Sequence, residues 1–113
     1  MLDRANRVTR PADFKSAVRT GRRFGTANMI VHVRATAPGD PVRFGFIITK
    51  AVGNAVTRNL VRRRLRSACR TALPTLGTGT DVVVRALPGL SESSWVSLQS
   101  EIADSLGRAV GRR

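Results

Sequence analysis

The residues best suited to a binding chemistry are arginines that recur between positions 53 and 70. Six arginines and no acidic residue occur in this stretch. At about 100° per residue of helix, its polar and apolar side chains separate onto opposite arcs. The polar arc holds Asn59, Arg62, Arg63, Arg66 and Arg70, and the apolar arc holds Val61, Leu65, Ala68, Cys69 and Ala72. The spacing therefore predicts an amphipathic helix over 56–72, with one face on a core and the other facing a polyanion.

The charge of this part of the chain has one sign. Eight cations and no acid occur between Pro41 and Thr80, so like charges at i, i+4, such as Arg62 and Arg66, are uncompensated there. A merely solvated helical face usually mixes both signs, and an anionic membrane surface requires bulkier apolar anchors than alanine and valine. A helix about 25 Å long reaches several consecutive phosphates, so the pattern favours nucleic acid as the partner.

Length and composition limit the class of protein to which this helix belongs. The chain has 113 residues, 42% of them hydrophobic, which suffices for one modest core, so we expect a single RNA-binding domain over 1–113. Its formal net charge is +13, and arginine, whose planar fork suits phosphate, supplies 18 of the 20 cations. No apolar run approaches the roughly 18 residues of a membrane span. We therefore expect a cytoplasmic protein with no membrane contact.

Few residues are suited to catalysis or metal binding. Cys69 is the single cysteine and falls on the apolar arc, which predicts a small buried side chain and excludes an internal disulfide. His32 is the single histidine and has no carboxylate near it in sequence, which favours a groove residue over a general base. We interpret Gly53 as a turn residue that leads into the helix, and Asn54 as the candidate N-cap of that helix. We expect no catalytic residue and no metal site in the chain.

The other elements follow from local patterns. A first helix is expected where Phe14 and Val18 share one face, and a last helix after a serine cap within 91–94. The apolar stripe of the last helix holds Trp95, Leu98, Ile102 and Leu106. Turn residues at 37–41 predict that two strands form an antiparallel hairpin, and an apolar run predicts a further strand buried on both faces. The expected ranges are a helix over 11–20, strands over 28–36, 42–49 and 81–87, and a frayed tail over 111–113.

The segment 49–66 closely resembles the signature of the bacterial ribonuclease P protein component. In that signature a strand ends in Ser/Thr-Lys, here Thr49-Lys50, and a Gly-Asn-Ala-Val loop leads into a helix that opens on Arg-Asn, here Arg58-Asn59. The first helix, with Asp13-Phe14, also resembles that of the family, so the resemblance covers essentially the whole chain. Leu60 departs from the pattern, because the motif usually has a second arginine there.

The resemblance implies a fold and an activity. Residue patterns alone give the order α-β-β-α-β-α of an α+β sandwich. The family implies a two-layer α-β-β-β-α-β-α sandwich with a left-handed βαβ crossover, similar to the second domain of ribosomal protein S5, an exception to the usual right-handed rule. It also implies the protein subunit of an endonuclease that removes 5′ leaders from precursor tRNA. Its RNA subunit carries the chemistry with Mg²⁺, and the protein is a monomer bound 1:1 to that RNA.

The resemblance also implies two groups of binding residues. Those implied for the catalytic RNA subunit are Asn54, Arg58, Asn59, Arg62, Arg63, Arg66 and Arg70. Those implied for the 5′ leader, in a cleft between the first helix and the sheet, are Phe14, Val18, Ile30, His32, Arg34, Ile48 and Lys50. Val18 and His32 stand where the family often has aromatic residues, so we expect weaker stacking of leader bases.

Two other functions remain open at this stage. A ribosomal or ribosome-assembly protein would bind structured RNA without any linked cleavage. A nonspecific DNA-compacting protein would bind duplex DNA as well as it binds RNA. Adding the purified chain to candidate RNAs, and asking which of them supports precursor cleavage at low magnesium, discriminates the first alternative from the leading hypothesis.

Overall fold

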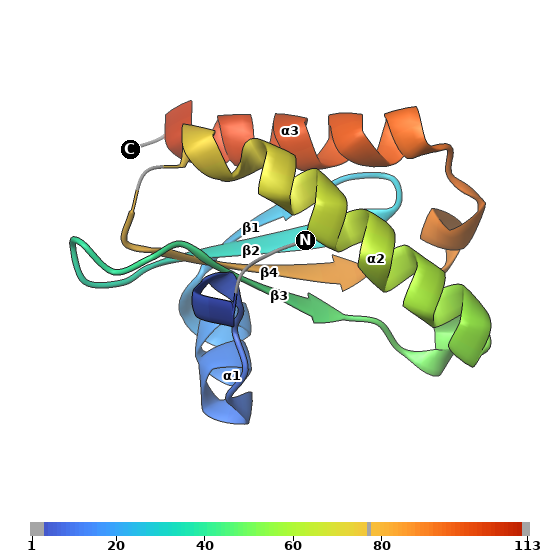
Figure 1. Cartoon of the computed structure of the whole chain (residues 1–113), viewed down its shortest axis with the longest axis horizontal. Helices are drawn as coiled ribbons and strands as arrows, with labels where there is room; N and C mark the ends of the chain where they lie inside the picture. Colours follow the sequence, from blue (N-terminus) through green and yellow to red (C-terminus); the bar gives the residue numbers. More distant parts are fainter. Residues whose placement is uncertain (1–3, 77, 112–113) are drawn as a thin grey trace.

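The computed structural model describes residues 4–76 and 78–111, which form a four-stranded sheet between helices (Figure 1). Helices α2 and α3 cover one face of the sheet, and α1 crosses the other face (Figure 1). The main elements are α1 (Pro11–Thr20), β1 (Arg22–Gly25), β2 (Met29–Ala35), β3 (Arg43–Ile47), α2 (Ala55–Ala72), β4 (Thr80–Ala86) and α3 (Trp95–Gly111). Short 3-10 helices span Arg4–Asn6, Lys50–Val52, Leu73–Thr75 and Pro88–Glu92. The order confirms the expected α+β class.

The strand order is β1-β2-β4-β3, so the predicted hairpin between 28–36 and 42–49 is wrong. Strand β4 lies between β2 and β3, antiparallel to the first and parallel to the second. Val82, Val83 and Val84 are fully buried, and this run needs a central position with both faces covered. The turn at 37–41 therefore closes a wider loop, whose Asp40 carbonyl accepts a hydrogen bond from the Gly79 amide at 2.7 Å.

The connection from β3 through α2 to β4 joins parallel neighbouring strands and is left-handed, as the family resemblance implied (Figure 1). Strand β1, which residue patterns alone did not predict, pairs with β2 from Arg22 opposite Val33 to Gly25 opposite Ile30. It is a four-residue edge strand with two adjacent arginines, so it lacks the period-two alternation that reveals longer strands.

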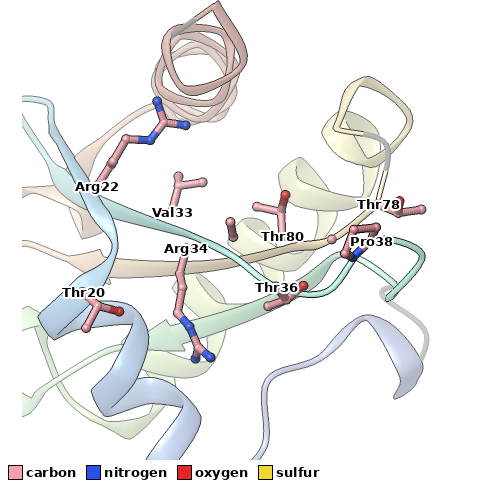
Figure 2. Close-up of a pocket in the computed structure, with 10 residues that line it drawn as sticks. Thr20, Arg22, Val33, Arg34, Thr36, Pro38, Thr78 and Thr80 are labelled. Atoms are coloured by element: carbon pink, nitrogen blue, oxygen red, sulfur yellow. The ribbon is translucent and has the colours of Figure 1, made fainter. Parts of the chain in front are cut away.

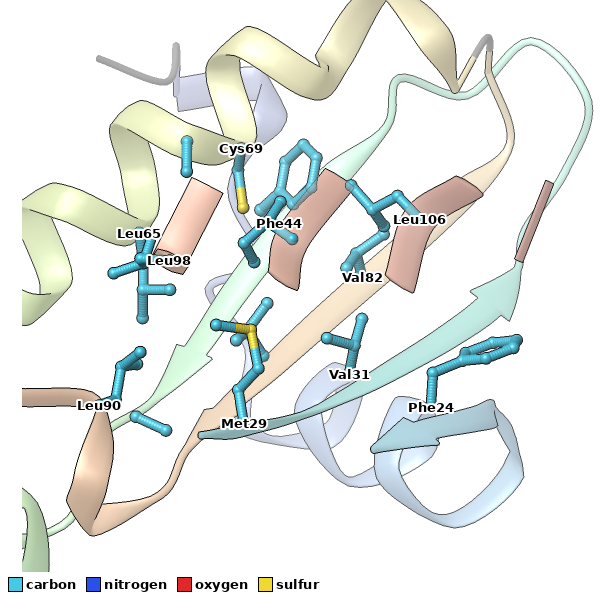
Figure 3. Packing of buried hydrophobic residues seen from close by; sticks show 14 of the residues in the cluster. Phe24, Met29, Val31, Phe44, Leu65, Cys69, Val82, Leu90, Leu98 and Leu106 are labelled. Carbon is cyan, nitrogen blue, oxygen red and sulfur yellow. The ribbon is translucent and has the colours of Figure 1, made fainter. Parts of the chain in front are cut away.

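The core lies between the sheet and the α2 and α3 layer (Figure 3). Helix α2 contributes Leu65 and Cys69, both fully buried, as its apolar arc predicted. Helix α3 contributes the predicted stripe of Leu98, Ile102 and Leu106, whereas Trp95 is only partly buried. Met29, Val31, Phe44, Val82 and Val84 fill the facing side of the sheet. Burial of these apolar surfaces is the main free energy that holds α2 against the sheet.

The start of α2 is fixed by two neighbouring residues, as predicted. The Asn54 side-chain oxygen accepts a hydrogen bond from the Thr57 amide at 2.9 Å, which caps the helix. Gly53 adopts φ 156°, and a Cβ at this position would lie 2.8 Å from Thr57 Cγ2. Only glycine fits this approach to the helix without strain. The last helix begins in the same way, because the Ser97 amide donates to Ser94 Oγ at 3.1 Å.

The face of the sheet that α1 crosses presents three rows of side chains across the strands. The strand register defines a first row of Arg43, Asp81 and Arg34, a middle row of Gly45, Val83 and His32, and a last row of Ile47, Arg85 and Ile30. Helix α1 packs over the middle row, where its Phe14 ring lies on Gly45 and Val83 is fully buried. The helix therefore separates the first row from the last.

A buried ion pair attaches this face to α1. Asp81 is fully buried, and its two carboxylate oxygens accept hydrogen bonds from Arg43 Nε at 2.9 Å and Nη2 at 2.7 Å. The third Arg43 nitrogen donates to Asp13 of α1 at 3.4 Å. The pKa of Arg43 is raised, chiefly by the hydrogen bond to Asp81, and this effect outweighs the lowering caused by burial. Arg43 thus neutralises a buried carboxylate and holds α1 on the sheet.

Gly45→Ala should lower the free energy of unfolding by about 1 to 3 kcal/mol, the usual effect of overpacking. The new Cβ would lie 2.5 Å from Phe14 Cε1 and 3.0 Å from Val8 Cβ, so the ring must leave its site. Urea unfolding measures the change. The matched control is Gly25→Ala in β1, where no atom lies within 4 Å of the new Cβ. Equal stability of the two variants would contradict the packing of Phe14 on Gly45.

Candidate nucleic-acid interface

The exposed side of α2 carries the residues predicted to meet RNA. Val61, Leu65, Ala68 and Cys69 are buried on the sheet, which leaves the polar arc facing away from the core. The residues of the predicted RNA-subunit group that are exposed are Asn54, Asn59, Arg63 and Arg70, and those that are half-buried are Arg58, Arg62 and Arg66. The structure therefore confirms the predicted division of this helix into an apolar and a cationic face.

Positive charge is crowded on this face. Burial lowers the pKa of Arg66, and the nearby Arg7 and Arg62 guanidiniums lower it further. Arg62 donates a hydrogen bond to Asn59 Oδ1 at 2.9 Å, which orients its fork along the helix surface. Arg58 Nε is buried and has no hydrogen-bond partner among the residues that the structure describes. Like-charge crowding of this kind is relieved when a phosphate is bound between the guanidiniums.

Arg7 belongs to this surface, although its sequence position gave no sign of it. Residues 7 and 8 run along the free edge of β3, where Val8 donates to the Phe44 carbonyl at 2.8 Å. Arg7 thereby joins Arg62 and Arg66 at a cavity of 230 Å³ that also includes Phe14. The cavity connects the cationic face of α2 with the α1 side of the sheet, so the two predicted binding groups meet at the β3 edge.

The α1 side of the sheet presents part of the predicted leader group. Phe14 and Val18 are half-buried on α1, Ile30 is half-buried in the last row, and Lys50 is exposed just beyond β3. His32 is 5% exposed beneath α1, so it offers little surface for stacking. Burial lowers the His32 pKa, and Arg23 and Arg85 lower it further, which keeps the ring neutral at pH 7. Its Nδ1 has no hydrogen-bond partner in the described part of the chain.

Two predicted leader residues lie elsewhere than expected. Ile48 is in the hydrophobic core, because the period of two along β3 sends Phe44, Phe46 and Ile48 toward α2. Its neighbour Ile47 occupies the last row instead. Arg34 lies in the first row, and α1 separates it from Ile30 and Lys50. The expected single cleft therefore does not contain the side chains of Ile48 and Arg34.

Two arginines on this side of the sheet were not among the binding residues predicted from the sequence. Arg85 is exposed in the last row, and Arg23 is exposed opposite His32 on β1. The alternation of the predicted strand over 81–87 would have placed Arg85 on the same face as Val83. The position of Arg23 on this face could not be predicted, because strand β1 was not predicted. Arg85 and Lys50 give the side of α1 that holds the last row a positive charge beside the apolar side chains of Ile30 and Ile47, and Arg23 adds a charge at the β1 end of the middle row.

Within 4–76 and 78–111, no group of three His, Cys, Asp or Glu side chains is placed to hold a metal ion. Cys69 is fully buried, and burial raises the pKa of its thiol, so it is not a nucleophile. No helix in the same residues is long and apolar enough to cross a membrane.

Solved structures share this fold. The ribonuclease P protein of Staphylococcus aureus matches with a TM-score of 0.83 and 24% identity, covering 94% of this chain and 96% of that one. The protein from Thermotoga maritima matches with a TM-score of 0.80 and 24% identity, covering 90% of this chain and 96% of that one. These likenesses confirm the architecture, including the mixed sheet and its helices.

Sequence comparison is more specific. The family model described as Ribonuclease P matches residues 2–110. The ribonuclease P protein component of Clavibacter michiganensis subsp. michiganensis is 50% identical over 110 residues, which cover 97% of each chain. That of Pseudarthrobacter chlorophenolicus is 46% identical over 116 residues, covering 99% of this chain and 85% of the relative. With the fold and the cationic helix, these matches show that the chain belongs to the bacterial ribonuclease P protein component family.

Proposed function

We propose that the cationic face of α2 binds ribonuclease P RNA, the partner that membership of the family implies for this chain. The observation that carries this proposal is the single-signed surface formed by Arg62 and Arg66 of α2 with Arg7 beside them. Arg7 and Arg62 both lower the pKa of Arg66, and a group of guanidiniums that close together is well suited to bind phosphate. We propose that this surface acts in a cytoplasmic particle of one protein and one RNA.

The 5′ leader of precursor tRNA is proposed to follow the flank of α1 that carries Ile30 and Arg85. Phe14 stands at the junction between this flank and the α2 surface, because it lines the same cavity as Arg62 and Arg66. Its ring offers a stacking surface for a leader base, while Arg85, Arg23 and Lys50 offer contacts to phosphates. A strand bound to the catalytic RNA at α2 could therefore continue directly onto the leader path.

The cleavage chemistry is assigned to the RNA subunit and the Mg²⁺ ions that it uses. The role of the protein in this proposal is positional and electrostatic. Its positive surface lowers the repulsion between two polyanions, the catalytic RNA and its substrate. By holding the leader on a fixed path, it brings the scissile phosphate to the RNA-bound metal ions and so raises the rate of 5′ maturation of tRNA.

Replacing Arg62, Arg63 and Arg66 together with alanine should weaken binding to ribonuclease P RNA. It should also flatten the plot of log K against log salt by roughly one phosphate contact for each arginine removed. The measurement is a filter-binding titration at several salt concentrations. Arg64→Ala is the control, because Arg64 is on the same helix but outside the polar arc. A slope that stays at the wild-type value would remove this face from the RNA interface.

Phe14→Ala should leave binding to the RNA subunit intact and reduce the affinity of the particle for leader-bearing precursor. The expected loss is about 1 to 3 kcal/mol, the usual contribution of one stacked base. Phe14→Leu separates stacking from packing, since leucine still covers Gly45 but has no ring. Both variants should bind mature tRNA as the wild type does. Equal losses for precursor and mature tRNA would mean that Phe14 does not contact the leader.

A further inference from the structure

A separate cavity opens at the free edge of β2, beyond the end of its pairing with β1 (Figure 2). Strand β1 begins at Arg22 opposite Val33, so Arg34 and the residues after it have no strand neighbour on that side. The cavity has a volume of 700 Å³ and lies between the end of β2, the last residue of α1 and the segment that enters β4. This volume is in the range of sites for small ligands.

Two polar atoms in this cavity are buried and lack a partner. Arg34 Nη1 and Thr36 Oγ1 each have no hydrogen-bond partner among the described residues. Figure 2 shows the Arg34 side chain extending from β2 toward the helix that carries Thr20. An unpaired buried donor is costly, and most such groups in native proteins are satisfied by a ligand, an ion or water. The pair therefore indicates a site that accepts a hydrogen-bonding ligand.

The chemistry of the site points to an anionic ligand, because no acidic side chain within residues 4–76 and 78–111 forms an ion pair with Arg34. The residue opposite Arg34 in the register is Asp81, but both Asp81 oxygens are taken by Arg43. Arg22, the other cation of the cavity, donates to the Ala109 carbonyl at 2.9 Å and so holds the end of α3. None of the described residues that line the cavity is acidic. Arg34 is thus the cationic side chain of this cavity that is available to bind an external anion.

We propose that this cavity binds a ribose-phosphate unit of an RNA strand, with Arg34 and Thr36 donating hydrogen bonds to the phosphate. A guanidinium fork with a hydroxyl suits phosphate oxygens, and the cavity is larger than a phosphate alone, which leaves room for the sugar. The described lining residues include no aromatic ring, so bases do not stack there and recognition is independent of sequence. The site lies across α1 from the proposed leader path and away from α2.

The test is a titration of the full-length, ¹⁵N-labelled chain with an RNA trinucleotide that lacks terminal phosphates. Amide shifts should appear at Thr20, Thr36 and Gly79, besides those on α2. Arg34→Gln should raise the dissociation constant at these amides about tenfold, as expected for one charged hydrogen-bonded contact, and leave the α2 shifts unchanged. Arg34→Lys should give an intermediate value, because lysine keeps the charge but not the fork. The spectrum itself reports whether each variant is folded.

Arg19→Gln is the matched control, since it removes one exposed charge of α1 next to Thr20 without altering the cavity lining. Its dissociation constant should stay within twofold of the wild-type value. Shifts confined to α2, or equal losses for Arg19→Gln and Arg34→Gln, would overturn the proposal. Inorganic phosphate and a mononucleotide are tested in parallel, and equal affinity for them would overturn the assignment to an RNA strand. Adenosine and uridine trinucleotides should bind alike. None of these results depends on precursor cleavage.

Discussion

The structure depends on the burial of one apolar stripe of α2 against the sheet. Leu65 and Cys69 are fully buried, and their burial fixes the rotation of the helix about its axis. Once that rotation is fixed, the arginines that alternate with the stripe can only face outward. The same hydrophobic contact thus forms the core and places the arginines on one face of α2. No further interaction is needed to hold the binding surface in place.

The opposite side of the sheet is organised by electrostatics and close packing. Asp81 is buried without a solvent contact, and Arg43 satisfies it while reaching Asp13 on α1. Gly45 leaves space for the ring of Phe14, the residue that follows Asp13 on the same helix. These two contacts set α1 across the middle row of the sheet. The helix then divides the face into a flank that continues from α2 and a flank that opens on Arg34.

The sequence predicted local features well and long-range pairing poorly. The α2 range, its Asn54 cap and the burial of Cys69 follow from periodicity and side-chain chemistry within a few residues. The hairpin prediction failed because the position of β4 between β2 and β3 depends on burial of its valines on both faces, a property of the assembled sheet. The resemblance assigned Ile48 to the leader group, but the alternation along β3 places its side chain in the core and that of Ile47 on the opposite face. Arg7 was missed because only the pairing of residues 7 and 8 with β3 brings it to α2.

Cross-linking tests the central claim most directly. Cys69 is buried, so a photoreactive group can be attached to a cysteine introduced by Arg63→Cys, with Ala103→Cys as the comparison. Arg63 is exposed on α2, whereas Ala103 is exposed on α3 next to the acidic side chain of Asp104. The account predicts cross-links to ribonuclease P RNA from position 63 and none from position 103. Equal cross-linking from both positions, or cross-linking from 103 alone, would contradict it.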